Sequence, residues 1–463
     1  MSYIKNTKIG RYIYDLFNKY NSVGIIGNSI WSIVGEIISK GFIFLTFVIV
    51  ARILGRYEYG QFGIIRTSIL MFATFGGMGL GLTANKYISQ EKKYNKVFAG
   101  KIIGLTHVVS AATGFFVCCL VYFFAEVIAI RLNAQFLTAE IKISAGILFF
   151  SSINGAQIGI LQGLESFKRL AISNLIQSLF FLILLTIGTY YWGVIGTIST
   201  YLISTILYTI ILELAIYIEL KKSEIKTQYS ELKELNKIIF YFTIPAALTG
   251  IIVSPFKWFS ETLIVKNGGF AELGIFQAAI IITTIIITIS SGLNAPLISV
   301  LASKKDSVAS ETQKLQYFNI YGSWFFFLII SFPFILFPNL ILYIFGEKFN
   351  DPTIFKVNLL LLLYCGLLLY YQGITRTFIV NGYIWLSVLT NIVEGVSLIG
   401  YIYVNQNFTS IGLSKAYVFS YVLRIVFTIP FLLYYRMIPR KMLYDKYFIL
   451  SLSIFLIVIL RSI

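Results

Sequence analysis

Arg52-x-x-Gly55-x-x-Glu58-x-Gly60-x-Phe62 recurs half a chain length later as Lys266-x-x-Gly269-x-x-Glu272-x-Gly274-x-Phe276. Each copy lies between two long apolar segments. A second matching pair, Ile195-Gly196 and Ile411-Gly412, occurs at nearly the same offset. Because self-similarity at a fixed spacing is the signature of internal duplication, the sequence predicts two similar halves.

The composition indicates a membrane protein. Hydrophobic residues make up 57% of the 463 residues and charged residues only 12%, with a mean hydropathy of +0.82. A soluble protein of this length could not bury so much apolar surface. Crossing a bilayer takes about 20 apolar residues in a helix, and runs of this length recur along the whole chain. The sequence therefore predicts an all-α polytopic membrane protein with roughly 12 to 14 transmembrane helices.

The apolar segments fall into two groups, one in each half. We place spans at 25–51, 60–85, 102–125, 143–164, 170–188 and 194–218, and again at 238–264, 273–302, 316–345, 357–375, 384–404 and 411–435. An even number of helices per half makes the repeats parallel. The predicted domains are a cytoplasmic basic amphipathic segment (1–24), an N-terminal six-helix lobe (25–218), a cytoplasmic inter-lobe loop (219–237), a C-terminal six-helix lobe (238–435), and a basic loop with an extra hydrophobic segment (436–463). Within the last, Tyr447–Leu460 fits either a short span or an interfacial helix.

Basic residues are distributed unevenly between the two sets of loops. If the N-terminus is inside, the cytoplasmic segments hold most of the 37 Lys and Arg residues. Because basic residues are retained on the cytoplasmic side of short loops, the sequence predicts a cytoplasmic N-terminus. The net charge of +17 is then mainly a topology signal, and its spread over many loops argues against nucleic-acid binding.

Few residues suit catalysis or metal binding. His107 is the only histidine, and Cys118, Cys119 and Cys365 all fall inside predicted spans. The sequence contains no nucleotide-binding loop and no cluster of carboxylates. We therefore expect no metal site, no cofactor and no enzymatic activity. Transport is the default function for a chain that is nearly all helical bundle.

Charged residues inside the predicted spans form the candidate site, since an ionised group at mid-membrane costs about 2.5 to 3.5 kcal/mol on insertion scales. They are the cations Lys40, Arg66, Lys257 and Arg424 and the carboxylates Glu36, Glu261 and Glu394. Such groups must face a watery cavity or one another. The excess of cations suits an anionic ligand such as a phosphate or diphosphate, which we expect these four side chains to bind.

Two pairs of these residues have a spacing of four, which places both members on one helix face. Glu36 with Lys40, and Lys257 with Glu261, can be structural pairs that fix helix rotation or part of a substrate path, and the sequence leaves both interpretations open. Arg66 and Arg424 have no such partner on their own helices, which favours a functional role. The three carboxylates can carry a coupling proton or sodium ion, or only balance the cations.

Three stretches carry a likeness to a known family: Ala51-Arg52-Ile53-Leu54-Gly55-Arg56-Tyr57-Glu58-Tyr59-Gly60-Gln61-Phe62-Gly63, Gly76-Gly77-Met78-Gly79-Leu80-Gly81-Leu82, and the basic loop Lys86–Lys93. Together with the second-half copy and Gln162-Gly163-Leu164-Glu165-Ser166-Phe167, they resemble the bacterial polysaccharide-exporter family. Its members are O-antigen and capsule repeat-unit flippases of the multidrug/oligosaccharidyl-lipid/polysaccharide (MOP) superfamily.

This resemblance implies two six-helix lobes around a central cavity in the cytoplasmic (inner) membrane of a bacterium. It implies a short oligosaccharide on undecaprenyl diphosphate as substrate, moved from the inner to the outer leaflet by alternating access. The partners would be this polyprenyl-diphosphate-linked oligosaccharide, membrane lipids, and a polysaccharide polymerase with its chain-length machinery. The resemblance does not identify any binding residues. The charged candidates therefore rest only on their position inside the predicted spans.

Three alternatives remain open at this point. A multidrug cation antiporter of the same superfamily resembles the chain in helix count and repeat, although a cavity for cationic drugs should be acidic. A lipid II flippase would handle a similar headgroup. A membrane-embedded polymerase or ligase would be expected to have a sizeable outer loop, and the predicted outer loops are short.

Overall fold

The computed structural model describes residues 25–77, 79–230, 251–294, 309–337 and 339–435, together with 243, 437–438, 445–446, 448–453 and 455. All regular secondary structure in this described part is helical. Nine of its helices are long and apolar enough to cross a membrane. The predicted all-α polytopic membrane protein is confirmed.

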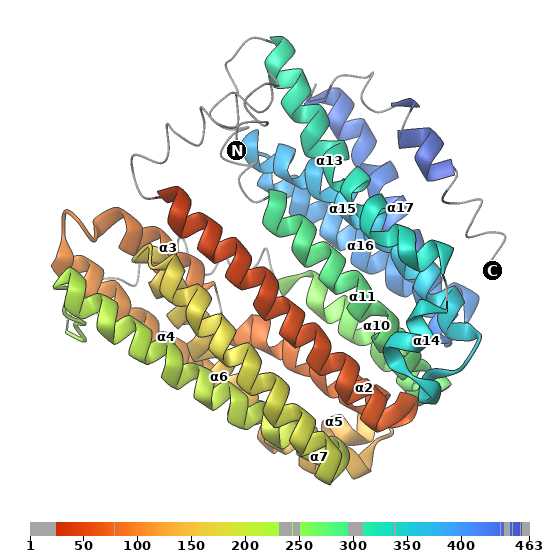
Figure 1. Cartoon of the computed structure of the whole chain (residues 1–463), viewed down its shortest axis with the longest axis horizontal. Helices are drawn as coiled ribbons and strands as arrows, with labels where there is room; N and C mark the ends of the chain where they lie inside the picture. The colour runs from red at the N-terminus through yellow and green to blue at the C-terminus, as the bar shows by residue number, and fades with distance from the viewer. Residues whose placement is uncertain are drawn as a thin grey trace, which may run out of the picture.

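Helices α2 to α7 form an N-terminal bundle, drawn red to yellow-green in Figure 1. Two of them are pairs of helices joined at a kink, α2 at Gly55 (φ 77°) and α7 at Trp192 and Gly193 (φ 57°). Because glycine adopts positive φ without steric cost, these kinks reverse the chain without a loop. The bounds are α2 Ile25–Gly77, α3 Leu80–Glu91, α4 Lys96–Phe123, α5 Ala125–Arg131, α6 Thr138–Gly163 and α7 Phe167–Ser223, with a 3-10 turn η2 at Gln135–Leu137.

Helices α10 to α17 form a C-terminal bundle, drawn green to blue. Its bounds are α10 Val253–Gly268, α11 Phe270–Asn294, α13 Ala309–Leu336, α14 Leu340–Phe345, α15 Thr353–Val380, α16 Ile384–Asn405 and α17 Ser410–Tyr434, with a 3-10 turn η5 at Glu347–Phe349. The junction of α10 and α11 lies at Gly269 (φ 90°), which corresponds to Gly55 in the first copy of the motif. Both copies therefore form the tight turn for which glycine is needed.

Two predicted spans differ from the helices observed. The span at 60–85 is interrupted, because α2 ends at Gly77 and α3 begins at Leu80 after the left-handed Gly79 (φ 68°). The span at 316–345 is also divided, since α13 ends at Leu336 and α14 is a separate short helix. Five further predictions lie wholly or partly outside the described residues. They are the segment 1–24, the inter-lobe loop beyond 230, the span 238–264 before residue 251 apart from 243, the span 273–302 beyond 294, and Tyr447–Leu460 apart from 448–453 and 455.

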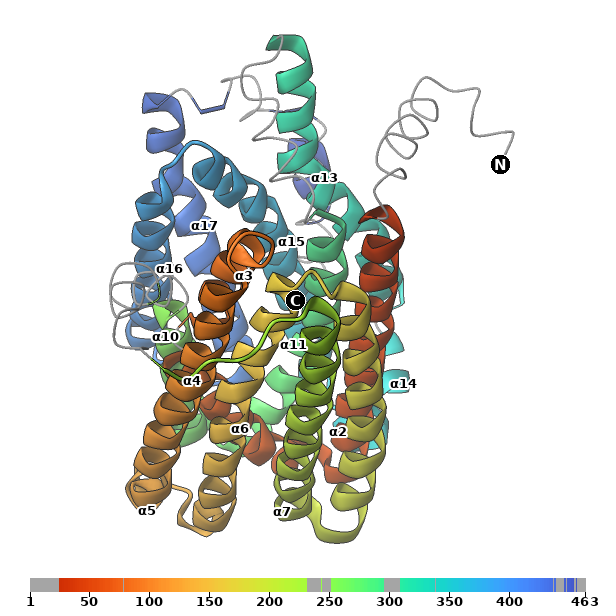
Figure 2. The same cartoon turned by 90° about the vertical axis from the view of Figure 1, so that its left-hand side faces the viewer.

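The two ends of the molecule differ in how the bundles meet. We call the end with the α2 and α7 kinks and α14 the outer end, and the opposite end the inner end, after the orientation that the basic residues predict. In Figures 1 and 2 the bundles converge at the outer end and spread apart toward the inner end. One core contains Phe62 and Phe276 and joins both bundles, whereas a second core, around Ile102 and Ile160, contains described residues of the N-terminal bundle only.

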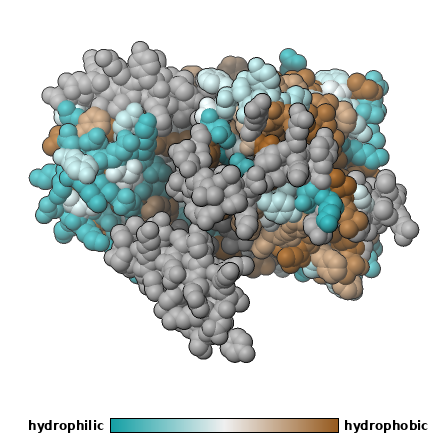
Figure 3. Space-filling view, turned by 90° about the horizontal axis from the view of Figure 1, so that it is seen from above, coloured by the Kyte–Doolittle hydropathy of each residue, from teal (hydrophilic) through white to brown (hydrophobic). Residues whose placement is uncertain are grey.

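The surface has the polarity of a membrane protein. In Figure 3 hydrophilic side chains gather over the left-hand end of the molecule, where the N-terminal bundle has its inner end. Hydrophobic side chains dominate the right-hand half, and hydrophilic ones return at its rim. Such an apolar band between polar ends is expected where a bundle contacts lipid hydrocarbon.

Candidate functional site

The two copies of the motif pack against each other at the outer end. A Cβ atom added to Gly60 would lie 1.9 Å from the Phe270 carbonyl oxygen, and one added to Gly274 would lie 1.8 Å from the Arg56 carbonyl oxygen. Gly60 corresponds to Gly274, and Arg56 to Phe270, so the contact is reciprocal. Only glycine lets the two backbones approach so closely. The duplicated sequence thus forms a pseudo-twofold crossing between the bundles.

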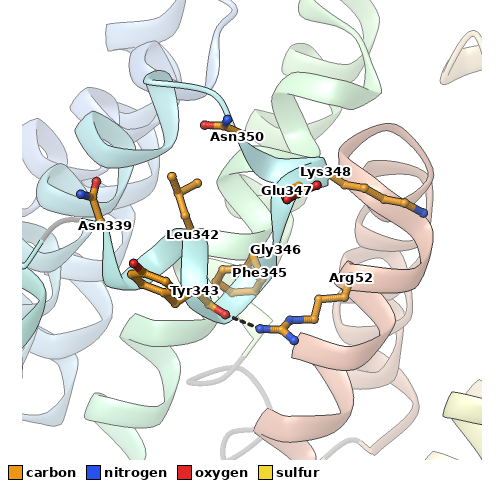
Figure 4. Close-up of a pocket in the computed structure, with 9 residues that line it drawn as sticks. All are labelled: Arg52, Asn339, Leu342, Tyr343, Phe345, Gly346, Glu347, Lys348 and Asn350. Carbon is orange, nitrogen blue, oxygen red and sulfur yellow. Dashed lines mark hydrogen bonds between the residues drawn. The ribbon is translucent and has the colours of Figure 1, made fainter.

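Three basic side chains fasten the bundles around this crossing. Arg52 donates from Nε to the Ile344 carbonyl, 2.7 Å away, and also bonds the Tyr343 carbonyl, as Figure 4 shows. Lys348 donates in the opposite direction, to the Ile53 carbonyl beside the α2 kink. These two residues cap the ends of helices that belong to the other bundle. They also line a surface cavity of about 700 Å³.

The third basic residue, Arg56, forms an ion pair with Asp351 at 2.7 Å. Both side chains are partly exposed, so the pair alone contributes little stability. Hydrogen bonds from Thr353, together with the Arg56 guanidinium, lower the pKa of the Asp351 carboxyl. We refer to Arg52, Arg56, Lys348 and Asp351 as the outer clasp.

A cavity of about 390 Å³ lies between the bundles, with walls from α2, α7 and α11. Lys40 and Arg66 both line it, so the structure brings two of the four predicted cations together. The remaining walls are mainly apolar, with Phe44 and Ile285 among them, and Gln177 and Tyr201 add polar groups. Lys40 is exposed and has no hydrogen-bond or ion-pair partner among the described residues.

A hydrogen-bond network connects Arg66 to a carboxylate of the other bundle. Arg66 donates to the side-chain oxygen of Gln277, and the Gln277 amide donates to Glu261 at 2.7 Å. Glu261, which is 4% exposed, also accepts from Thr67 at 2.6 Å. The guanidinium of Arg66 lies 4.6 Å from the ring centre of Phe47. Its Nε is buried and has no hydrogen-bond partner among the described residues.

The other two predicted cations, Lys257 and Arg424, do not line this cavity. Lys257 lies beside a cluster of tyrosines, with Nζ 3.4 Å from the Tyr364 hydroxyl. Arg424 is buried, forms an ion pair with Glu394, and lies 4.0 Å from the ring centre of Tyr371. Glu394 therefore neutralises Arg424 directly, through a pairing between α16 and α17.

Neither pair with four-residue spacing forms an ion pair. Glu36 and Lys40 are both exposed, and Glu261 takes its hydrogen bonds from Thr67 and Gln277 while Lys257 turns toward the tyrosines. Spacing places two side chains on one face, but a helix in a bundle offers each of them competing partners on its neighbours. Glu261 and Lys257 take such partners, whereas Glu36 and Lys40 have none among the described residues.

Sequence reasoning missed the neutral members of the site. Gln277 directly follows Phe276, the last residue of the second motif copy, and a polar residue at that place in an apolar span is a weak signal that could have identified it. The tyrosines around Lys257 gave no signal, since tyrosine is common throughout the chain. Arg376 was also missed; it is 7% exposed and bonds the side chain of Asn319 at 2.6 Å.

A family model described as "Polysaccharide biosynthesis protein" matches residues 25–286 of the chain. No curated protein matches it. Among solved structures, the chain is similar to an inward-facing multidrug resistance MATE family transporter of the MOP superfamily, with a TM-score of 0.70 and 18% identity over 88% of this chain and 97% of that one. The lipid II flippase MurJ in an inward closed conformation gives a TM-score of 0.70 and 15% identity over 94% of this chain and 98% of that one.

A MOP superfamily transporter from Pyrococcus furiosus, for which reverse polarity of the binding pocket suggests a different function, gives a TM-score of 0.66. It shares 17% identity over 89% of this chain and 95% of that one. At these identities the similarity establishes the fold. The helical fold of this chain is thus one that solved transporters also have.

Proposed function

The chain belongs to the polysaccharide biosynthesis protein family, and on this premise we propose that it flips an oligosaccharide linked to undecaprenyl diphosphate across the cytoplasmic membrane of a bacterium. Family and fold together support a membrane flippase or transporter. The cargo is the proposed part: a repeat unit of O-antigen or capsular polysaccharide. The observation that supports this cargo is the cavity between the bundles, which Lys40 and Arg66 both line.

The two cations suit a diphosphate. Moving this group through a low-dielectric interior is costly unless charged donors replace its hydration. A guanidinium and an ammonium form short, charge-assisted hydrogen bonds to phosphate oxygens. Both side chains line the cavity, and the Lys40 ammonium has no hydrogen-bond or ion-pair partner among the described residues. The apolar wall around Phe44 and Ile285 suits the first prenyl units of the lipid.

The arrangement of the bundles supports alternating access. With the outer end fastened and the inner bundle ends apart, the cavity is poised to receive cargo from the inner leaflet. Release on the other side requires the reciprocal glycine crossing and the outer clasp to separate. The cargo then meets the polymerase and chain-length machinery at the outer face, and the flippase itself catalyses no bond change.

Glu261 is the carboxylate that we propose for coupling to a proton or sodium ion. Glu394 already neutralises Arg424, and Glu36 is exposed. Glu261 is buried, and its hydrogen-bond donors among the described residues are neutral: Thr67 of the N-terminal bundle and Gln277 of the C-terminal bundle. A cation bound there would alter the contacts that hold the bundles together.

The experiment that tests the proposal begins with deletion of the gene in its bacterial host. We expect undecaprenyl-diphosphate oligosaccharide to accumulate facing the cytoplasm, and surface polysaccharide to disappear. Complementation with Lys40→Gln/Arg66→Gln should fail, whereas wild type should restore the surface polymer at equal protein level. Unchanged polysaccharide with new sensitivity to cationic drugs would instead establish a multidrug exporter. Loss of viability with accumulated lipid II would establish a lipid II flippase.

A further inference from the structure

A second polar cavity lies at the inner end of the N-terminal bundle, apart from the one between the bundles. Its volume is about 680 Å³. The end of α3, the turn between α6 and α7, and both ends of α7 surround it. The two ends of α7 meet there because the kink at Gly193 folds this helix back on itself. No part of the proposed transport path uses this cavity.

The cavity has a positive excess. Two of its five basic residues are neutralised locally, Lys92 by Glu165 at 2.8 Å and Arg169 by Glu219. The other three have no ion-pair partner among the described residues, and all line the same cavity: Lys93, Lys168 and Lys222. Three like charges converge on one hollow, an arrangement that repels itself unless an anion is present.

The N-terminus of α7 opens into the same cavity. Its N-cap residue Ser166 is only 9% exposed and lines the cavity, yet its hydroxyl caps no backbone amide and makes no other hydrogen bond with a described residue. The first turn of α7 holds no acidic side chain and carries Lys168 and Arg169 instead. Cations at this end oppose the helix dipole, whereas the free amides of the first turn favour an anion.

We infer that this cavity binds the phosphate group of a membrane lipid. Phosphate oxygens accept hydrogen bonds from ammonium groups, from a serine hydroxyl and from the amides of a helix N-terminus, which are the donors present. Ile172 lines the same cavity and is 45% exposed, so an acyl or prenyl chain attached to the phosphate has an apolar surface beside it. The cavity lies at the ends of spanning helices, where lipid headgroups lie. The site does not depend on the proposed cargo.

The general attraction of a basic inner surface for anionic lipid needs a matched control. Lys221 and Lys226 are exposed lysines at the same end of the N-terminal bundle, and neither lines the cavity. Lys168→Gln/Lys222→Gln and Lys221→Gln/Lys226→Gln therefore remove the same charge from the same end. Ser166→Ala removes one hydroxyl and no charge. Comparison of the three variants distinguishes binding in this cavity from general attraction of anionic lipid to the basic surface.

The test is native mass spectrometry of the purified full-length protein with added phosphatidic acid, undecaprenyl diphosphate, or zwitterionic phosphatidylcholine. We expect phosphatidic acid or undecaprenyl diphosphate, whose phosphate groups carry a net negative charge, to bind in preference to phosphatidylcholine, whose phosphate is balanced by choline. Lys168→Gln/Lys222→Gln should weaken it about tenfold, Ser166→Ala about threefold, and Lys221→Gln/Lys226→Gln less than about twofold. Phosphatidic acid binding that Lys168→Gln/Lys222→Gln weakens assigns the site to bulk anionic lipid. If that variant weakens binding of undecaprenyl diphosphate only, the site is assigned to a prenyl lipid, and Lys40→Gln/Arg66→Gln separates this binding from the cavity between the bundles. Both support the phosphate site.

Equal weakening by the two double variants would overturn the inference, because the attraction would then belong to the whole surface. So would a wild-type protein that binds neither of the two anionic lipids in preference to phosphatidylcholine. Size-exclusion chromatography shows whether Lys168→Gln/Lys222→Gln folds. If it does not, the lipid affinity of the Ser166→Ala protein tests the inference instead. A Ser166→Ala protein with unchanged affinity would contradict the assigned donors.

Discussion

Gln277 joins a cation of one bundle to a carboxylate of the other through a neutral amide. Its oxygen accepts from Arg66 and its nitrogen donates to Glu261, so each charge is solvated without direct contact between the two. A direct ion pair would hold Arg66 more tightly and compete with an anionic ligand. The amide therefore keeps Arg66 available to the cavity while it still satisfies Glu261.

Gln277→Leu should impair transport more than folding. The change leaves Glu261 with one donor fewer and Arg66 without its acceptor, at a cost of about 1–3 kcal/mol of stability. We expect surface polysaccharide to fall several-fold at equal protein level, and a lower unfolding temperature in detergent. Gln177→Leu is the control for stability, since Gln177 lines the cavity without a described partner. An unfolding temperature for Gln277→Leu equal to that control would argue against the network.

Glu394→Gln should destabilise the protein strongly, because it leaves Arg424 buried without its counter-charge, at a cost of roughly 3–5 kcal/mol. Replacing both partners, as Glu394→Leu/Arg424→Met, should recover most of that loss. Thermal unfolding in detergent measures both variants. If the double variant also transported, Arg424 would have a structural role only. If the double variant were stable but could not transport, Arg424 would be part of the substrate path.

The sequence predicted the interior cations as candidates, but only partly how they are grouped. Lys40 and Arg66 do share a cavity, whereas Arg424 pairs with Glu394 on a different helix. Spacing along one helix reveals which side chains share a face. It does not reveal which neighbouring helix lies opposite, and that neighbour decides whether a charge is free or neutralised.

Among the elements, the crossing of α2 with α11 positions both bundles. The turn at Gly55 and the junction at Gly269 fall at the same position of the two motif copies, and both have the positive φ that glycine adopts without steric cost. That the two copies pack on each other was not predicted. The second glycine of each copy, Gly60 and Gly274, makes the reciprocal backbone contact. Sequence symmetry shows that two elements are alike and does not show that they touch.

Gly60→Ala should prevent normal closure of the outer end. The added carbon would lie 1.9 Å from the Phe270 carbonyl oxygen, so the bundles must move apart, at about 1–3 kcal/mol for an overpacked contact. We expect transport to fall sharply, and Gly274→Ala to behave in the same way because the contact is reciprocal. Gly400→Ala is the matched control, since no atom lies within 4 Å of the added carbon there. Normal transport by Gly60→Ala would contradict the close crossing.

Across the whole molecule, the contacts that must break during transport lie at the outer end. The outer clasp joins residues far apart in the chain, Arg52 and Arg56 in the first half and Lys348 and Asp351 in the second. Each contact is partly exposed and individually weak, which allows the closed state to be reversible. Away from the outer end, the second core contains, among the described residues, side chains of the N-terminal bundle only.

A cross-link across the clasp should arrest transport. Arg56→Cys/Asp351→Cys, in a background in which Cys118, Cys119 and Cys365 are replaced, should react with a short thiol-cleavable cross-linker. We expect transport to stop on cross-linking and to return when the linker is cleaved. The same background without the new pair controls for the reagent. Undiminished transport by the cross-linked protein would mean that the outer end does not need to open.

The most direct test of the central claim is flipping by the purified protein in proteoliposomes. A fluorescent undecaprenyl-diphosphate oligosaccharide is placed in both leaflets, and the fraction that an external reagent can quench is followed over time. We predict that wild type exposes the whole pool, and that Lys40→Gln/Arg66→Gln leaves the inner-leaflet half protected while Lys221→Gln/Lys226→Gln behaves as wild type. Equal flipping by wild type and the Lys40/Arg66 variant would contradict the cationic cavity as the path of the diphosphate.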